Sequence, residues 1–390
     1  MKDVMTKRTF RLPVLALVAI AAWGQGANAP YKVHDTKPVI THGPVLLNPS
    51  ETGVSILWTT DTPCHSKVLY GSGQLDQSFE PAEHGMLKVG TRHLVHLTGL
   101  LPGRTYSYRI ASTRVVKLKG YWPEKGLNVE SGPFSFKTLD RSKPEASFAF
   151  ITDTHEDAAR VNALTGMIDW TKADFLVHGG DAFHTIESED HLFERWLDPA
   201  AAALKQTVPL IWLRGNHETR GAFVREMPAY VAPPEGRYYF ARDHGPMHLI
   251  VIDSGEDKPD ETNVYGGLNN FVSYRRQEYD WFSNHVKTAD RIHSAPFKVI
   301  LVHQPGWGYV EMQNGKWVQL ANEAGADLVI SGHTHRFSHR LPKDGENRYH
   351  HLIVGQDQLA MVSATKDALT VNVIARDGKP VESFTLTPRR

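Results

Sequence analysis

The stretch LVISGHTHRF, residues 328–337, is an apolar run that ends at a glycine and leads into His333 and His335. In extended chain, residues i and i+2 point to the same side, so we expect the pair to reach one place, or two neighbouring places. That arrangement is typical of metal ligands, but in a chain with 21 histidines it is equally typical of a polar surface turn. The other apolar runs must decide between the two interpretations.

Four further apolar runs end in the same kinds of side chain. The runs SFAFIT, DFLVHGG, VPLIWLRG and FKVILV lead, in this order, into Asp153 and His155; Asp181; Asn216, His217 and Glu218; and His303. Ligand sites of open α/β sheets lie outside the carboxyl ends of the strands, so these side chains are predicted to meet in one crevice. Chance explains one or two such strand ends, but not five in order.

The donor types restrict the chemistry. The candidate ligands are Asp153, Asp181, Asn216, His155, His303, His333 and His335. Nitrogen and oxygen donors without thiolate suit Zn, Mn or Fe. Seven ligands are too many for one ion with an open position, but they fit two ions about 3.5–4 Å apart that share a carboxylate. Such a centre would hold a phosphate oxyanion, and the implied reaction is hydrolytic phosphoryl transfer.

The series Asp153-x-His155, Gly180-Asp181, Gly215-Asn216-His217-Glu218, His303 and Gly332-His333-x-His335 resembles the calcineurin-like metallophosphoesterase superfamily. With the β-rich segment that precedes it, the chain is most similar to purple acid phosphatases. The resemblance implies a four-layer α/β/β/α sandwich of two mixed sheets flanked by helices. It also implies a dinuclear enzyme that hydrolyses phosphomonoesters by attack of a metal-bound hydroxide. Phosphodiesters of nucleotides or lipid head groups are the alternative substrates, and a non-catalytic surface binding protein is the remaining alternative.

The resemblance also implies roles for individual residues. One ion would be held by Asp153, His155, Asp181 and His335, and the other by Asp181, Asn216, His303 and His333. His217 is similar to the histidine that contacts substrate and protonates the leaving alkoxide, with a capping or supporting role as the alternative. We expect Glu218 to lie outside the ligand shell and to orient Asn216 or His217.

The motif after the second strand departs from the purple acid phosphatase pattern. In that family GDxxY supplies a tyrosine to ferric iron, whereas this chain has His184 in the tyrosine position. We therefore predict no purple Fe³⁺ centre. His184 is a candidate contact to the first metal or to the substrate, and a solvent-facing histidine is the alternative.

Two regions must position these residues. Residues 36–140 alternate like an antiparallel β-sandwich and are predicted to form a fibronectin type III-like domain, with a tyrosine corner in residues 100–108. From 141 to 390, apolar strands alternate with helical periodicity, which indicates an α/β catalytic domain. Residues 369–386 are predicted to form a hairpin that closes the second sheet.

The loops beside the crevice would determine the substrate specificity. Trp307, Tyr309 and Trp317 could stack on a base or a sugar, although such aromatics more often pack the loop. Arg336 could contact an anionic substrate, and a plain surface arginine is the alternative.

The remaining properties concern the location and the partners. Residues 1–29 combine a basic head with the apolar run 12–23, which predicts a signal peptide and export to the periplasm or beyond; an uncleaved anchor is the alternative. The one cysteine, Cys64, excludes a thiolate metal site and an intramolecular disulfide. Lys and Arg balance Asp and Glu at 43 each, so we expect a small phosphorylated substrate, no nucleic-acid surface and no stable membrane partner.

Overall fold

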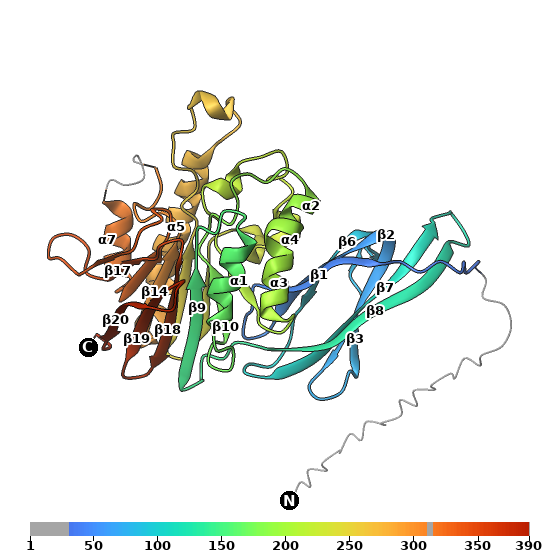
Figure 1. The fold of residues 1–390 in the computed structure, drawn as a ribbon, viewed down its shortest axis with the longest axis horizontal. Helices are drawn as coiled ribbons and strands as arrows, with labels where there is room; N and C mark the ends of the chain where they lie inside the picture. Colours follow the sequence, from blue (N-terminus) through green and yellow to red (C-terminus); the bar gives the residue numbers. More distant parts are fainter. Residues whose placement is uncertain (1–30, 310–314, 390) are drawn as a thin grey trace, which may run out of the picture.

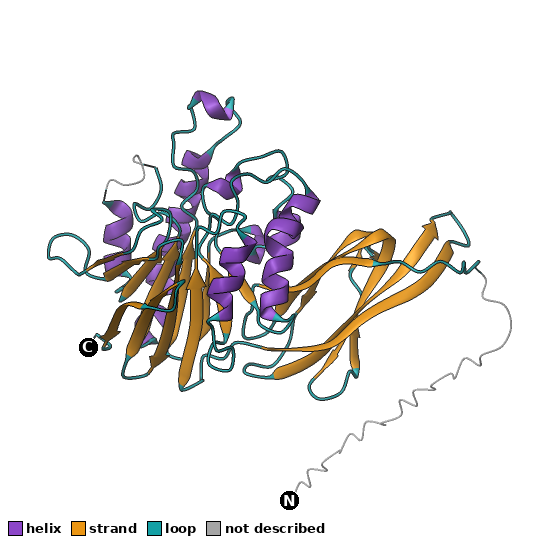
Figure 2. Ribbon diagram, viewed as in Figure 1, coloured by secondary structure: helices purple, strands orange, loops and turns teal. Residues whose placement is uncertain are grey.

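A computed structural model describes residues 31–309 and 315–389 of the chain. The predicted signal peptide, residues 1–29, lies outside these residues. The chain forms a layered α/β body and an elongated β region beside it, as Figure 1 shows. In Figure 2 the helices gather around the sheets of the body, whereas the elongated region is built of strands and loops.

The first sheet of the body carries three of the five strands that lead into candidate ligands. Its body strands are β9 (Glu145–Ile151), β10 (Phe175–His178), β11 (Leu210–Trp212), β18 (Gln358–Thr365), β19 (Leu369–Ala375) and β20 (Pro380–Leu386). β9, β10 and β11 run parallel, so their carboxyl ends lie at one edge. Side chains alternate along β9, with Phe148 and Phe150 in one core and Ala149 and Ile151 in another.

The second sheet carries the other two strands. It consists of β12 (Phe240–His244), β13 (Met247–Ile252), β14 (Phe297–Val302), β15 (Leu328–Ser331), β17 (His350–Ile353) and β16 (Ser338–Arg340), in that order. Four neighbouring strands, β13, β14, β15 and β17, are parallel. Leu249 and Val251 of β13 join the core that the two sheets share, and Ile250 and Ile252 point to the opposite side.

Helices cover the outer face of each sheet. The first sheet is covered by α1 (Ala158–Gly166), α2 (Glu189–Leu192), η1 (Phe193–Leu197), α3 (Asp198–Leu204) and α4 (Pro228–Val231), and the second by α5 (Phe271–Thr288), α6 (Asp290–Ser294) and α7 (Lys316–Glu323). Three short turns of 3₁₀-helix are η2 (His217–Thr219), η3 (Pro234–Gly236) and η4 (Asn263–Tyr265). This arrangement confirms the predicted order of layers, helix, sheet, sheet and helix. Among the described helices, none has the length and apolar character that a membrane crossing needs.

The N-terminal region is made of strands around a core of its own. They are β1 (Ile40–Leu47), β2 (Val54–Gly71), β3 (Gln77–Phe79), β4 (Ala82–Glu83), β5 (Met86–Leu87), β6 (Val89–Leu97), β7 (Thr105–Lys117) and β8 (Glu124–Lys137). Trp58, Tyr108 and Phe136 are buried together in this core. The Leu101 amide donates to the Tyr106 hydroxyl at 3.0 Å, which is the hydrogen bond expected of a tyrosine corner. The fibronectin type III-like assignment itself stays a prediction.

Hydrogen bonds continue across the predicted domain boundary. Strand β1 pairs with β11, with Leu47 opposite Leu210, so the first sheet runs on into the N-terminal strands. The hydroxyl of Tyr108 donates to the Gln206 carbonyl at 2.7 Å. The four clusters of buried apolar residues all lie between Val45 and Val373.

The prediction for the C-terminal hairpin was half wrong. β19 and β20 do form a hairpin, with Leu369 opposite Leu386. It extends the first sheet rather than the second, because β18 pairs antiparallel with β9 and carries the hairpin to that edge. The pairing of β18 with β9 therefore determines which sheet the hairpin joins, because the hairpin follows β18 directly.

Candidate metal centre

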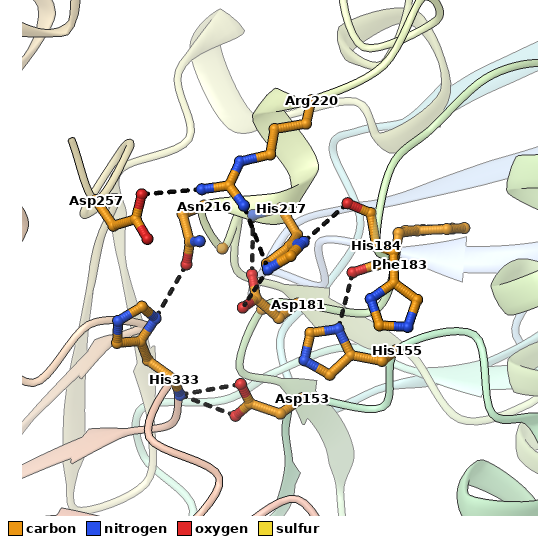
Figure 3. A network of polar contacts seen from close by, with 12 residues as sticks. Asp153, His155, Asp181, Phe183, His184, Asn216, His217, Arg220, Asp257 and His333 are labelled. Carbon is orange, nitrogen blue, oxygen red and sulfur yellow. Dashed lines mark hydrogen bonds and ion pairs between the residues drawn. The ribbon is translucent and has the colours of Figure 1, made fainter. Parts of the chain in front are cut away.

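The candidate ligands meet where the parallel strands end. Asp153 follows β9, Asp181 follows β10 and Asn216 follows β11, while His303 and His333 follow β14 and β15 of the facing sheet. Figure 3 shows side chains from both sheets turned toward a common space. The convergence predicted from the strand ends is thus present in the structure.

The side chains form two neighbouring groups of three. The first ligand group is Asp153, His155 and His335, and the second ligand group is Asp181, His303 and His333. Within each group, the candidate ligand atoms all lie within 4.8 Å of one another. Asn216 belongs beside the second group, because its Oδ1 lies 3.0 Å from His333 Nδ1.

Most of the candidate ligands have left-handed backbone, which sets the direction of their side chains. The φ angles are 54° at Asp153, 44° at His155, 55° at Asp181, 68° at His333 and 59° at His335. The prediction that the His333 and His335 pair is extended was therefore wrong. β15 ends at Ser331, and a left-handed turn divides the two imidazoles between the two groups. Such backbone is unfavourable for residues with a Cβ, and it recurs at sites where function requires a particular side-chain direction.

Two glycines make the close approach possible. A Cβ at Gly332 would stand 2.4 Å from Asp153 Oδ2, and one at Gly180 would stand 2.7 Å from His303 Nδ1. Neither contact is tolerable, so the glycines next to Asp181 and His333 follow from packing.

His303 provides the clearest test of whether a cation fits. Its Nδ1 lies 2.8 Å from the Gly179 carbonyl and donates to it, which leaves Nε2 facing the Asp181 carboxylate at 3.0 Å. This buried Nε2 has no hydrogen bond of acceptable geometry. Burial lowers the pKa of His303, but the Asp181 carboxylate outweighs burial and raises the pKa to about 10. A buried nitrogen without a hydrogen bond, in a field of carboxylates, is the environment that a metal cation completes.

The two carboxylates are held in their charged form. Asp153 accepts hydrogen bonds from the His333 amide, at 2.9 and 3.1 Å to its two oxygens, and from Thr152 Oγ1 at 2.8 Å. Burial would raise the pKa of Asp153, but the hydrogen bond with His335 and the charge of His303 hold it below its usual value. His303 likewise outweighs burial and lowers the pKa of Asp181. Two ionised carboxylates, together with imidazoles that give up a proton when a cation binds, are suitable ligands for divalent ions.

Comparison with known proteins agrees with this geometry. Residues 146–337 match the family model described as calcineurin-like phosphoesterase. This stretch is therefore similar to calcineurin-like phosphoesterases, and it is called the phosphoesterase domain below. The family hydrolyses phosphoesters and uses metal ions.

One solved structure shares the fold of this chain. A structure of PhoD is 12% identical, covers 88% of this chain and 89% of its own, and superposes with a TM-score of 0.54. A conserved uncharacterized protein from Streptococcus pneumoniae TIGR4, described as a predicted phosphoesterase, is 15% identical, with coverage of 63% and 99% and a TM-score of 0.32. At these identities the likeness concerns the fold alone. No curated protein matches the sequence significantly.

His217 and His184 lie at the rim of the phosphoesterase site. The His217 amide donates to Asp181 Oδ1 at 3.0 Å, and its Nδ1 donates to the His184 carbonyl at 2.8 Å. Its Nε2 remains 4.0 Å from Asp181 Oδ2. The exposed His184 ring stacks on His155, with ring centroids 4.7 Å apart. His155, His184 and His217 form a third group of possible ligand atoms.

Glu218 supports the site in a different way from the one predicted. Its buried carboxylate accepts from the amides of Asp181 at 2.8 Å, Ala182 at 2.6 Å and Gly215 at 2.7 Å. No hydrogen bond joins it to the described side chains of Asn216 or His217, so the predicted partners were wrong. Burial, with Asp181 nearby, raises the pKa of Glu218 to about 7. Glu218 therefore links the turns after β10 and β11, because its carboxylate accepts hydrogen bonds from backbone amides in both turns.

The sequence analysis missed Arg220. Its guanidinium binds Glu256 through Nε and Nη2, both at 2.8 Å, and reaches Asp257 at 2.9 Å. Nη1 lies 3.4 Å from His217 Nε2, as seen at the top of Figure 3. The position of Arg220, three residues after His217, was the available signal. Its partners come from the loop after β13, which only the fold brings near.

The flanking aromatics follow the plainer of the two expectations. Trp307 and Trp317 are 3% and 1% exposed and stack on each other, with ring centroids 6.2 Å apart. They pack the loop against α5 and α7, and a substrate would have to displace them to stack there. Arg336 is exposed and forms no ion pair with any described residue.

Proposed function

We propose that this chain is an exported, dinuclear metal-dependent phosphoesterase that acts on phosphomonoesters. The observation that carries the proposal is the pair of ligand groups side by side, each made of one aspartate and two histidines. Two such groups within the phosphoesterase domain support a two-ion centre. Export rests on the leader-like residues 1–29.

The ligands divide naturally between two ions. Asp153, His155 and His335 would hold one, and His303, His333 and Asn216 would hold the other, with Asp181 shared. Zn, Mn and Fe all suit these donors. When bound, the ions supply Lewis-acid polarisation of a phosphoryl oxygen and activation of a water molecule.

The chain's own residues then act on the substrate. His217 turns Nε2 toward the site because its Nδ1 is committed to the His184 carbonyl. When Nε2 also carries a proton, that N–H would donate to a phosphoryl oxygen and then pass its proton to the leaving alkoxide, while Nδ1–H stays bound to the His184 carbonyl. The Asp181 carboxylate also accepts from the His217 amide, so one residue couples the ligand shell to the proton donor.

His184 replaces the tyrosine of purple acid phosphatases in this proposal. Its stacking on His155 supports a contact to the first ligand group or to the substrate. An imidazole produces no tyrosinate charge-transfer band, so the loaded enzyme should lack the purple colour. A visible band of that kind in the pure protein would contradict the proposal.

Elemental analysis and two chromogenic esters test the proposed function together. We expect about two ions per chain, and faster hydrolysis of p-nitrophenyl phosphate than of bis-p-nitrophenyl phosphate. Faster hydrolysis of the diester would favour a phosphodiesterase with the same centre. Bound metal without turnover of either ester would favour a binding protein instead.

A further inference from the structure

The hairpin between β7 and β8 ends in an apolar tip whose large side chains are exposed within the described part of the chain. Leu118 is 68% exposed, Tyr121 is 85% exposed and Trp122 is 61% exposed. Figure 1 shows this hairpin at the end of the molecule farthest from β19 and β20. Single exposed apolar residues are ordinary on a soluble protein, but a leucine, a tyrosine and a tryptophan within five positions at a projecting tip are not.

Positive charge surrounds the tip. Lys117, Lys119 and Lys125 lie at or beside it, whereas Glu124 is its one acidic residue. Lys119 forms an ion pair with Glu124, and His34 also contacts that carboxylate. Lys117 has no ion pair among the described residues, so the tip keeps an excess of positive charge.

The N-terminal segment of the chain enters the fold at this tip. Val33 forms a parallel bridge with Lys125, and the Lys125 ammonium lies 5.0 Å from the centre of the Tyr31 ring. In the sequence, seven residues separate the apolar run 12–23 from Tyr31. The eight Cα–Cα steps from Trp23 to Tyr31 span at most about 29 Å when fully extended.

We propose that Leu118, Tyr121 and Trp122 form a membrane-contact tip that binds the surface of an anionic phospholipid bilayer. Tyrosine and tryptophan are favoured at the bilayer interface because each has an apolar ring and a polar group. Neighbouring lysines attract anionic head groups. A projecting hairpin enters the head-group layer without a groove on its partner, whereas a docked protein would need one. The tip departs from the sequence-based expectation of no membrane partner, and it does not depend on the metal centre.

Vesicle binding tests the proposal. The chain from Tyr31 onward, which holds all four cores, is mixed with vesicles of equal parts phosphatidylglycerol and phosphatidylcholine, and the bound fraction is measured by flotation. We expect the wild type to bind. The variant Leu118→Ser/Tyr121→Ser/Trp122→Ser should partition about tenfold more weakly or worse, because it loses the apolar area that enters the interface. Brominated lipid should quench the wild-type fluorescence, and Trp122→Phe should remove most of that quenching.

The chain offers a matched control. Met86, Leu87 and Val89 are a second run of exposed apolar residues, but they lack an aromatic ring. The variant Met86→Ser/Leu87→Ser/Val89→Ser should bind vesicles like the wild type. Lys117→Gln should weaken binding to anionic vesicles only.

Several outcomes would overturn the proposal. These are no vesicle binding by the wild type, equal binding by the tip variant, or an equal loss in the control variant. Self-association through the tip without lipid binding, measured by light scattering, would assign the surface to a second copy and overturn the proposal as well. A circular-dichroism spectrum and a thermal unfolding midpoint of the tip variant that match the wild type would show that its loss of binding is not a loss of folding.

Discussion

Buried histidines occur in both regions of the molecule, and their surroundings give them opposite properties. In the N-terminal region, His93 lies against Trp58 and contacts Thr60 Oγ1 at 2.9 Å, and burial lowers its pKa to about 4. In the phosphoesterase domain, His303 is as deeply buried, but the Asp181 carboxylate raises its pKa to about 10. The carboxylate that the fold places beside a buried histidine therefore decides the direction of its pKa shift.

The two ligand groups also differ from each other. His303 and Asp181 of the second group are fully buried, whereas the His335 side chain of the first group is 43% exposed. The first group is thus open to solvent at His335, and His155 of the same group contacts both His335 and the exposed ring of His184.

Replacing His303 by alanine should cause the largest loss of activity and of bound metal, because His303 is the buried histidine beside a carboxylate. His303→Ala removes a ligand and leaves Asp181 without its partner. Loss of a residue outside the ligand shell lowers activity by up to about 100-fold. Loss of His303 should lower activity by more than that. Bound metal should also fall, as measured by elemental analysis. The matched variant His93→Ala should keep its metal, and a similar loss of metal there would contradict the distinction.

His217→Gln should separate a substrate contact from a ligand. The turnover number should fall by about 10²–10⁴-fold, because a proton donor is lost. The metal content should stay at the wild-type value, because His217 belongs to neither of the two ligand groups that we assign to the ions. If the variant loses metal instead, the third group of histidines takes part in metal binding.

Glu218→Gln should have a smaller effect. The amide cannot accept as strongly from the three backbone amides that Glu218 joins, so the turns that carry Asp181 and Asn216 should loosen. We expect a loss of about 10–100-fold in metal affinity or activity. Titration with a metal chelator measures the affinity. An unchanged affinity together with unchanged activity would show that the turns hold their shape without this carboxylate.

His93 should give the smallest effect, and one that depends on pH. Its pKa is about 4 in the folded chain and 6.5 in the unfolded chain, so between these values the unfolded chain binds more protons. Stability should fall as the pH falls from 6.5 to 4, by up to about 3 kcal/mol from this residue. His93→Gln should reduce that slope in thermal unfolding followed between pH 7 and pH 4. An unchanged slope would mean that other buried histidines carry it.

Much of the fold and the site was predictable from local patterns. Apolar runs marked β9, β10, β11, β14 and β15, since buried parallel strands are continuously apolar. The residues after each run then predicted the crevice, because parallel strands bring their carboxyl ends together. The spacing could not show the left-handed turn at His333 and His335, since an H-x-H pair suits both extended and turned backbone.

Contacts between distant segments were beyond the sequence. The pairing of Arg220 with Glu256 joins two loops that are unrelated in sequence pattern. The edge that receives β19 and β20 depends on where β18 pairs. The exposure of Leu118, Tyr121 and Trp122 depends on which other described segments lie near the hairpin tip, and only the folded chain shows this.

The sequence by itself determined the kind of chemistry. Aspartates, histidines and an asparagine at successive strand ends specify a nitrogen and oxygen donor set, and that depends only on residue types and order. The tertiary structure alone decided how the donors divide into a buried group and an open group, and what supports each. Such a division rests on distances between atoms far apart in the chain, and these exist only after both sheets have packed together.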